Sequence, residues 1–287
     1  MKVKTALRQL YYRLPLVREL RALRPSAPDT RLEQEAFVQQ LMQSSRYARF
    51  KRLNRFEHQV FSQNGEDGVI TEIFRRIEPR TRTFLEIGVG NGQINNTTFL
   101  LTQGWRGYWM EGNPRSMEQI LRAFSRPIKE GQLNVLQTVV TRENAVAELS
   151  KLGVPTDLDL LSLDVDRNTY WILSSVLTAV NPRAAVIEYN ALFPPDVHWS
   201  VEYDPARWWN RTSYYGASLK AYEKLCGEHG LALVGCELHG VNAFFVRQDL
   251  CGDQFEAPFS AENHYEPPRY FLVRTQGYPP CFTDVTD

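Results

Sequence analysis

The sequence predicts an α/β fold: a mostly parallel sheet with a C-terminal antiparallel hairpin, preceded by an N-terminal helical extension. Three observations lead to this prediction. Strand-like and helix-like segments alternate from about residue 61 to 230, and strands separated by helices form parallel sheets covered on both faces. The strand-like segments 231–236 and 243–247 are joined by a connection too short for a helix, so they must pair antiparallel. Apolar residues at helical spacing open the chain.

The individual elements follow in order along the chain. A basic helix is expected over about 3–23, interrupted at Pro15, and a second polar helical stretch reaches about Gln59. Short apolar runs then predict strands at 83–87, 107–111, 133–140, 158–163, 184–188, 231–236 and 243–247. The intervening segments predict helices at 96–102, 116–124, 145–152, 170–177 and 218–228. A parallel sheet that ends in a hairpin is the Rossmann-like layout of class I methyltransferases, whereas dinucleotide-binding dehydrogenases lack this ending.

Charge separates the chain into an N-terminal arm, residues 1–55, and a body, residues 56–287. The arm carries 13 Lys/Arg against 4 Asp/Glu, a net of +9, so the other 232 residues carry −9. A basic amphipathic arm fits contact with an anionic membrane surface or with a partner subunit. The alternative is a solvated helical extension that packs on its own domain. The acidic body argues against nucleic acid as a partner, and the oligomeric state is left open.

The cysteines predict a reducing compartment. Cys226, Cys236, Cys251 and Cys281 show neither paired metal-ligand spacing nor the density of a disulfide scaffold. The sequence contains no apolar run of 18 residues, and arginines interrupt the apolar residues at its start. We therefore expect a cytoplasmic protein, with peripheral attachment to the inner face of the membrane as the option that the basic arm adds.

A glycine-rich segment between a strand and a helix predicts a nucleoside cofactor. Glu86 precedes glycines at alternate positions, Gly88, Gly90 and Gly92, and glycine lets a backbone turn sharply and approach a ligand closely. Dinucleotide folds use the spacing Gly-x-Gly-x-x-Gly around a pyrophosphate, which this segment lacks, and the early acid would repel phosphate. S-adenosylmethionine is therefore favoured over NAD. Glu111 ends the next strand, where a carboxylate can bind the ribose hydroxyls of either cofactor.

Several short segments together resemble the FkbM-type family of methyltransferases over about residues 56–250. They are Phe61-Ser62-Gln63-Asn64-Gly65-Glu66-Asp67, the glycine segment, Asn95-Asn96-Thr97, Gly104-Trp105-Arg106-Gly107, Glu111-Gly112-Asn113-Pro114, Leu163-Asp164-Val165-Asp166 and Asn242-Ala243-Phe244-Phe245-Val246-Arg247. The resemblance implies methyl transfer to a hydroxyl oxygen, commonly on a sugar of a polysaccharide or glycosylated natural product. It also implies that Gln63, Glu66 and Asp67 lie near the cofactor pocket, and we count Asn96 among the cofactor-binding residues.

Oxygen-bearing side chains end two buried strands and predict a divalent metal site. Asp164 follows the strand 158–163, while Glu188 and Asn190 follow 184–188. Carboxylates packed together are costly unless a cation or proton lies between them, and oxygen ligands suit Mg²⁺ or a similar ion. The metal-free alternative stays open, because Asp164 can instead contact the cofactor or the acceptor.

A methyl transfer to a hydroxyl needs a group that accepts the proton. His198 is our first candidate and Asp166 the second, with a merely solvated histidine as the alternative. The loop 193–216 is rich in aromatic and charged residues, which suits a sugar acceptor, although such a loop can also be a lid packed on its own domain. The sequence thus predicts an S-adenosylmethionine-dependent O-methyltransferase of a sugar or polysaccharide. The alternatives are a metal-free methyltransferase of a small molecule or peptide, and a non-catalytic cofactor-binding subunit of a glycan-assembly complex.

Overall fold

The computed structural model describes residues 30–272 and 282. The chain divides into two compact units, Met1–Arg46 and Tyr47–Asp287. In the first unit the described residues form α3 (Thr30–Met42), so this helix ends well before Gln59. The basic helix predicted over 3–23 lies outside the described residues.

The second unit begins about nine residues earlier than the predicted boundary at residue 56. Tyr47 and Leu53 are buried, and Asn54 donates from Nδ2 to the Cys236 carbonyl over 2.8 Å. The Tyr47 hydroxyl donates to Glu266 Oε2 over 2.6 Å. These contacts to residues far along the chain make 47–55 part of the domain, which the net charge of the segment could not indicate.

A seven-stranded sheet forms the centre of this unit, in the order β3-β2-β1-β4-β5-β7-β6. The strands are β1 (Thr83–Ile87), β2 (Arg106–Glu111), β3 (Leu133–Gln137), β4 (Asp157–Leu163), β5 (Asn181–Glu188), β6 (Leu231–Cys236) and β7 (Asn242–Arg247). The first five run parallel, and β7 lies antiparallel between β5 and β6. The predicted hairpin is therefore confirmed, and the sheet has the Rossmann-like fold of class I methyltransferases.

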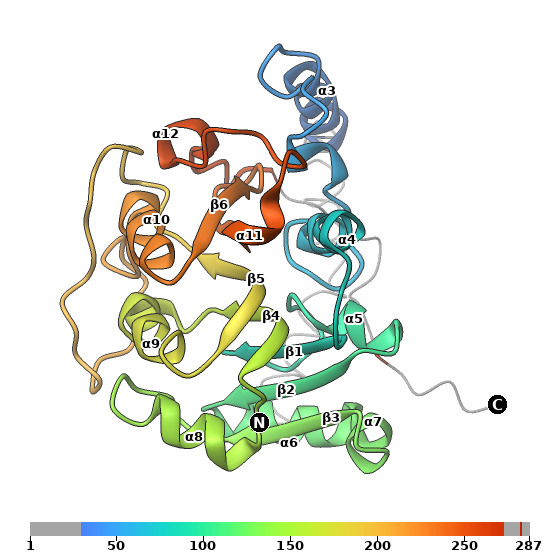
Figure 1. Cartoon of the computed structure of the whole chain (residues 1–287), viewed down its shortest axis with the longest axis vertical. Helices are drawn as coiled ribbons and strands as arrows, with labels where there is room; N and C mark the ends of the chain where they lie inside the picture. The colour runs from blue at the N-terminus through green and yellow to red at the C-terminus, as the bar shows by residue number, and fades with distance from the viewer. Residues whose placement is uncertain (1–29, 273–281, 283–287) are drawn as a thin grey trace, which may run out of the picture. The chain divides into compact units, whose positions relative to one another are not determined.

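Helices cover the sheet on both faces (Figure 1). One apolar cluster joins the sheet to α8 (Ala145–Leu152), α9 (Thr169–Val176) and α10 (Leu219–Glu228). A second cluster on the other face includes α4 (Glu66–Ile77), α5 (Thr98–Thr102) and α6 (Pro114–Ala123). The remaining described helices are the short segments η1 (Leu53–Phe56), α7 (Ser125–Lys129), η2 (Asp166–Asn168), α11 (Gln248–Cys251) and α12 (Ala261–His264).

The helix α4 was absent from the sequence-based prediction. Its apolar residues have helical spacing, since Val69, Ile70, Ile73, Phe74 and Ile77 are all buried on one side. The signal was therefore present in the sequence, immediately after the Phe61–Asp67 segment.

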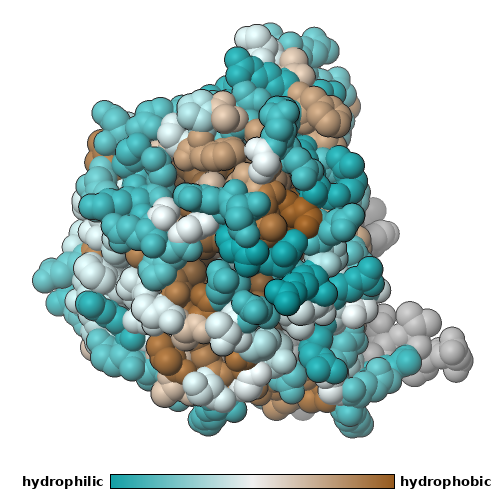
Figure 2. Space-filling view, viewed as in Figure 1, coloured by the Kyte–Doolittle hydropathy of each residue, from teal (hydrophilic) through white to brown (hydrophobic). Residues whose placement is uncertain are grey.

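The surface of this domain is largely hydrophilic on the face drawn in Figure 2, with hydrophobic side chains gathered in patches between polar ones. Among the described residues, no helix has the length and apolar character that crossing a bilayer requires. The carboxyl ends of the parallel strands β1, β2, β4 and β5 lie along one edge of the sheet. The residues that follow these four strands form the candidate site.

Candidate active site

The turn after β1 brings its backbone against the end of β4. Gly88 has φ +88°, and a Cβ at this position would lie 1.6 Å from the Asp164 carbonyl oxygen. Gly90 has φ +63°, and a Cβ there would meet no atom within 4 Å. Glycine is thus required at position 88, because the ends of β1 and β4 approach each other closely there. At Gly90 the backbone is instead bordered by open space. Both glycines line a cavity of about 640 Å³.

Gly92 and Glu86 lie beneath this cavity and do not line it. A Cβ at Gly92 would lie 2.7 Å from the Phe124 ring and 2.9 Å from the Trp109 ring, so this glycine is required by core packing. Glu86 is buried, and its carboxylate accepts hydrogen bonds from Asn95 Nδ2 (2.7 Å) and Thr97 Oγ1 (2.5 Å). Burial raises the pKa of Glu86 to about 7.

Asn96 also supports the turn from below. Its backbone N–H donates to Glu86 Oε1 over 3.1 Å, and its Nδ2 donates to Ser162 Oγ over 3.1 Å. Glu86, Gly92 and Asn96, which the sequence predicted as cofactor-binding residues, are absent from the lining of the cavity, and their predicted contact with the cofactor stays a prediction. These residues fix the shape of the turn, because their polar groups are used within the protein.

Glu111 lies where the sequence predicted a ribose-binding acid. It ends β2 and lines the 640 Å³ cavity. Its Oε2 accepts from Gly90 N–H (2.7 Å) and its Oε1 from Asn113 N–H (2.6 Å). The cavity is further lined by Met110, Val139, Thr141, Asp164, Asp166, Tyr203 and Trp208. A carboxylate held at the end of β2, beside open backbone at Gly90, is suited to bind a pair of ribose hydroxyls.

The segment after Phe61 shapes a second cavity, of about 710 Å³. Gln63 lines this second cavity, but Glu66 and Asp67 are buried and line neither. Asp67 Oδ2 accepts the backbone N–H groups of residues 60, 61 and 62 over 2.7–2.8 Å. Glu66 accepts from Asn64 N–H (2.7 Å) and Asn242 Nδ2 (2.8 Å). Both carboxylates hold a loop in place, and their expected closeness to the cofactor stays a prediction.

Burial changes the charge properties of these two acids. Burial, reinforced by the charge of Glu237, raises the pKa of Glu66. Burial likewise raises the pKa of Asp67, against the lowering effect of its backbone donors. Both groups are structural acids, even though they belong to the segment that carries the family resemblance.

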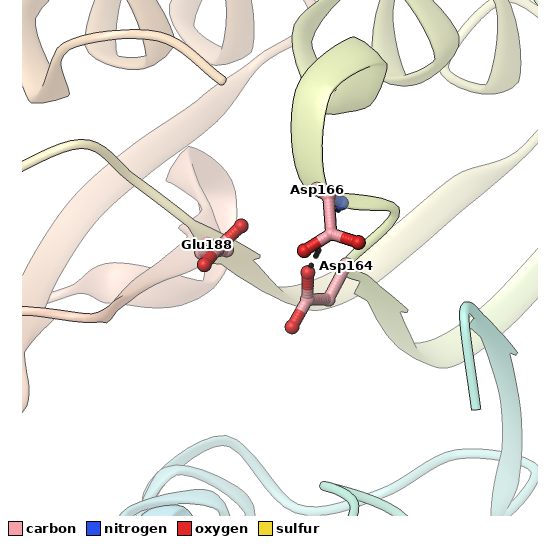
Figure 3. Close-up of side chains that lie close together, drawn as sticks. All are labelled: Asp164, Asp166 and Glu188. Atoms are coloured by element: carbon pink, nitrogen blue, oxygen red, sulfur yellow. Dashed lines mark hydrogen bonds between the residues drawn. The ribbon is translucent and has the colours of Figure 1, made fainter. Parts of the chain in front are cut away.

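Three carboxylates meet where the two cavities adjoin. Asp164 and Asp166 follow β4 and Glu188 ends β5, two strands that pair in parallel. One oxygen from each lies within 4.8 Å of the others (Figure 3). Asp164 and Asp166 line both cavities, and Glu188 lines the second. Asp166 has φ +60°, an uncommon backbone conformation for a residue with a side chain.

The environment of this acidic cluster disfavours three negative charges. Burial and the neighbouring charges of Asp164 and Asp166 raise the pKa of Glu188 well above its ordinary value. Burial and the charge of Asp166 likewise raise the pKa of Asp164. Glu188 Oε2 is buried without a hydrogen-bond partner among the described residues. Such an oxygen is costly unless a cation or proton compensates it.

Asn190 has a different role from the metal ligand that the sequence predicted. Its side chain is buried, and Nδ2 donates to the carbonyls of Ser213 (2.9 Å) and Tyr215 (3.1 Å). Its Oδ1 accepts from Leu192 N–H over 3.3 Å. Because the amide is used to hold the loop 193–216, the structure places Asp166, rather than Asn190, with Asp164 and Glu188.

His198 lies away from the candidate reaction site. It is exposed and lines neither cavity. The neighbouring Trp199 holds this part of the loop elsewhere. Its ring stacks on Phe193 with the ring centroids 4.3 Å apart, and its backbone N–H donates to Ser218 Oγ over 3.0 Å. The histidine that lines the second cavity is His239, on the β6–β7 connection. The sequence offered no signal that this connection reaches the site.

The aromatic residues of the loop 193–216 divide into two groups. Trp199 and Tyr214 contact each other, with ring centroids 5.6 Å apart, and Tyr214 is 42% exposed. Others line the cavities: Tyr203 and Trp208 the first, Trp209 and Tyr215 the second. Trp208 and Trp209 are 68% and 43% exposed. Part of the loop therefore packs on its own domain and part lines the two cavities, while contact with a sugar stays a prediction.

Comparison with known proteins gives similar folds only. No family model and no curated protein sequence matches the chain. A putative caffeoyl-CoA O-methyltransferase from Staphylococcus aureus is similar in structure, with a TM-score of 0.46, 13% identity and coverage of 75% of this chain and 99% of that chain. An S-adenosylmethionine-dependent methyltransferase from Clostridium acetobutylicum ATCC 824 has a TM-score of 0.39 and 11% identity, over 62% of this chain and 88% of that chain.

The pyocyanin biosynthetic protein PhzM has a TM-score of 0.36 and 14% identity, over 62% of this chain. The chain spans 54% of the length of PhzM. The chemistry of the present protein therefore has to be inferred from its own residues.

Proposed function

We propose that this protein is an S-adenosylmethionine-dependent O-methyltransferase that acts on a hydroxyl of a sugar or glycan, similar to the FkbM type. The observation that carries the proposal is the wall shared by the two cavities. Asp164 and Asp166 line both the cavity at the glycine turn and the cavity under the loop 193–216. A methyl donor in the first cavity and an acceptor in the second would meet at these carboxylates.

The first cavity suits the donor for reasons of shape and charge. Open space above Gly90 allows close approach to the backbone, and Glu111 is fixed beside it. Glu111, Asp164 and Asp166 give the lining three acids against one arginine, Arg207. Arg207 itself pairs with Asp204 over 3.0 Å. Such a lining is better suited to a cationic sulfonium than to a pyrophosphate.

The chain's own residues would contribute positioning and proton acceptance. Asp166 is the carboxylate proposed to accept the hydroxyl proton while the methyl–oxygen bond forms and the methyl–sulfur bond breaks. The products are the methyl ether, S-adenosylhomocysteine and a protonated Asp166, which returns its proton to solvent. In the ion-free site, partial desolvation raises the pKa of Asp166 above its ordinary value, which makes it a better base. Holding both reactants in line supplies much of the acceleration.

The acidic cluster also fits a divalent cation. The three oxygens within 4.8 Å and the unpartnered Glu188 Oε2 form the kind of donor set that Mg²⁺ prefers. Asp164, Asp166 and Glu188 would hold the ion. When bound, the ion would lower the pKa of an acceptor hydroxyl.

The lining of the second cavity favours a sugar acceptor. Trp209, Tyr215 and Tyr270 present aromatic surfaces, and Gln59, Gln63 and Asn64 present polar groups. Aromatic faces pack against apolar faces of sugar rings, while amides bind hydroxyls. This mixture suits a ring that is apolar on its faces and polar at its edge.

Two assays test the proposal: calorimetry for the methyl donor, and methyl transfer for the acceptor and the metal ion. We expect S-adenosylmethionine to bind the purified protein, and Glu111→Gln to weaken that binding. Glu118→Gln, an exposed acid on α6 outside both cavities, is the matched control. Absence of binding by the unmodified protein would refute the donor assignment. Methyl transfer to a glycan panel, with Mg²⁺ and with EDTA, then tests the acceptor and the cation.

A further inference from the structure

The second cavity is lined by an arginine that forms no ion pair with another described residue. Of the described residues that line this cavity, Arg211 is the only lysine or arginine. The acids Asp164, Asp166 and Glu188 line the same cavity. None of the ion pairs found among residues 30–272 joins Arg211 to these acids or to any other. The cavity therefore combines an acidic cluster with a separate positive charge.

The backbone around Arg211 is held in a defined turn. Arg211 has φ +64°, a conformation that is unfavourable for a residue with a side chain. Thr212 Oγ1 donates to Asn210 Oδ1 over 2.6 Å, and Trp209 Nε1 donates to the Thr212 carbonyl over 2.6 Å. On the C-terminal side, Asn190 holds the carbonyls of residues 213 and 215. Arg211, which is exposed, and Trp209 both lie on this turn, and both line the second cavity.

These observations point to an acceptor with its own negative charge. We propose that the acceptor sugar carries an anionic group, a carboxylate or a phosphate, that binds Arg211 while its ring packs against Trp209. This inference rests on the proposed function, because it names the acceptor class for the same site. An anion is repelled by the acidic cluster and attracted by Arg211, so only one orientation of the ring is favourable. That orientation turns a hydroxyl, rather than the anionic group, toward Asp166.

Arginine suits either anion, since its planar guanidinium forms paired hydrogen bonds with carboxylate and phosphate. The test therefore uses three probes that differ only at C6: methyl glucoside, methyl glucuronide and methyl glucoside 6-phosphate. Calorimetry would measure their binding to the full chain in the presence of S-adenosylhomocysteine and EDTA, so that the acidic cluster stays without a metal ion. We expect at least one anionic probe to bind about tenfold more tightly than the neutral glucoside. The better of the two anions identifies the source of the charge.

Arg211→Gln should remove the preference for the anionic probe while leaving S-adenosylhomocysteine binding unchanged. Arg122→Gln, an exposed arginine on α6 away from both cavities, should leave the preference intact. The inference is overturned if neither anion binds more tightly than the glucoside, or if Arg211→Gln keeps the full preference. A separate titration with S-adenosylhomocysteine alone tests the proposed function. If S-adenosylhomocysteine does not bind, the proposed function fails, whatever the sugar probes do.

Discussion

Gly88→Ala should be the most damaging small substitution in the glycine turn. The added Cβ would lie 1.6 Å from the Asp164 carbonyl oxygen, less than half of the 3.4 Å at which ordinary contact begins. The obstacle is backbone at the end of β4, which cannot rotate away as a side chain could. A left-handed alanine costs about 1–2 kcal/mol, and overpacking costs about 1–3 kcal/mol more. We therefore expect the free energy of unfolding to fall by about 2–5 kcal/mol.

Gly90→Ala provides the comparison, because it has φ +63° but open space around the added Cβ. It should cost only the conformational term, about 1 kcal/mol. Urea denaturation followed by circular dichroism would measure both variants. Equal losses for Gly88→Ala and Gly90→Ala would refute the close approach of β1 and β4 that the structure shows. A greater loss at Gly90 would refute it more strongly.

Three further predictions concern the acids and the loop anchor. Glu111→Gln should weaken S-adenosylhomocysteine binding about tenfold in calorimetry, since one charge-assisted contact is lost; unchanged affinity would exclude Glu111 as the ribose ligand. Glu188 keeps its proton to higher pH in the folded protein than in the unfolded chain, so folding stability falls as pH rises through the ordinary glutamate range and beyond. In EDTA, Glu188→Gln should therefore raise the melting temperature at pH 7 and have little effect at pH 4; equal shifts at both values would contradict the raised pKa. Asn190→Ala leaves the carbonyls of Ser213 and Tyr215 without their donor, so the free energy of unfolding in EDTA should fall by about 2 kcal/mol. An Asn190→Ala protein of full stability in EDTA but with weaker Mg²⁺ binding would restore Asn190 as a ligand.

The sheet was predictable because its signals are local. The segments 83–87 and 231–236 are apolar runs of strand length bounded by turn residues, and the structure forms both strands at those residues. The hairpin also followed from chain length, since no helix fits between residues 236 and 242. The helix α4 carried an equally local signal in Val69, Ile70 and Ile73, so its omission was a failure of interpretation.

The acidic cluster was predictable only in part. Parallel strands bring their carboxyl ends to one edge, so β4 and β5 had to place Asp164 near Glu188. The identity of the third residue in the cluster depended on the path of the backbone after β4 and after β5, which the sequence pattern did not indicate. Asp166, with φ +60°, joins the cluster, whereas Asn190 is bound to carbonyls 23 and 25 residues further along the chain.

The sequence by itself therefore determined the positions of the strands, the mostly parallel sheet, the terminal hairpin, the glycine turn and the presence of acids at two strand ends. These features depend on side-chain periodicity and on the geometry of parallel strands. Only the tertiary structure decided that Gly92 serves core packing, that Glu66 and Asp67 hold a loop, and that His239 rather than His198 lines a cavity. The physical reason is that loop paths are set by contacts between residues far apart in sequence, which local patterns do not encode.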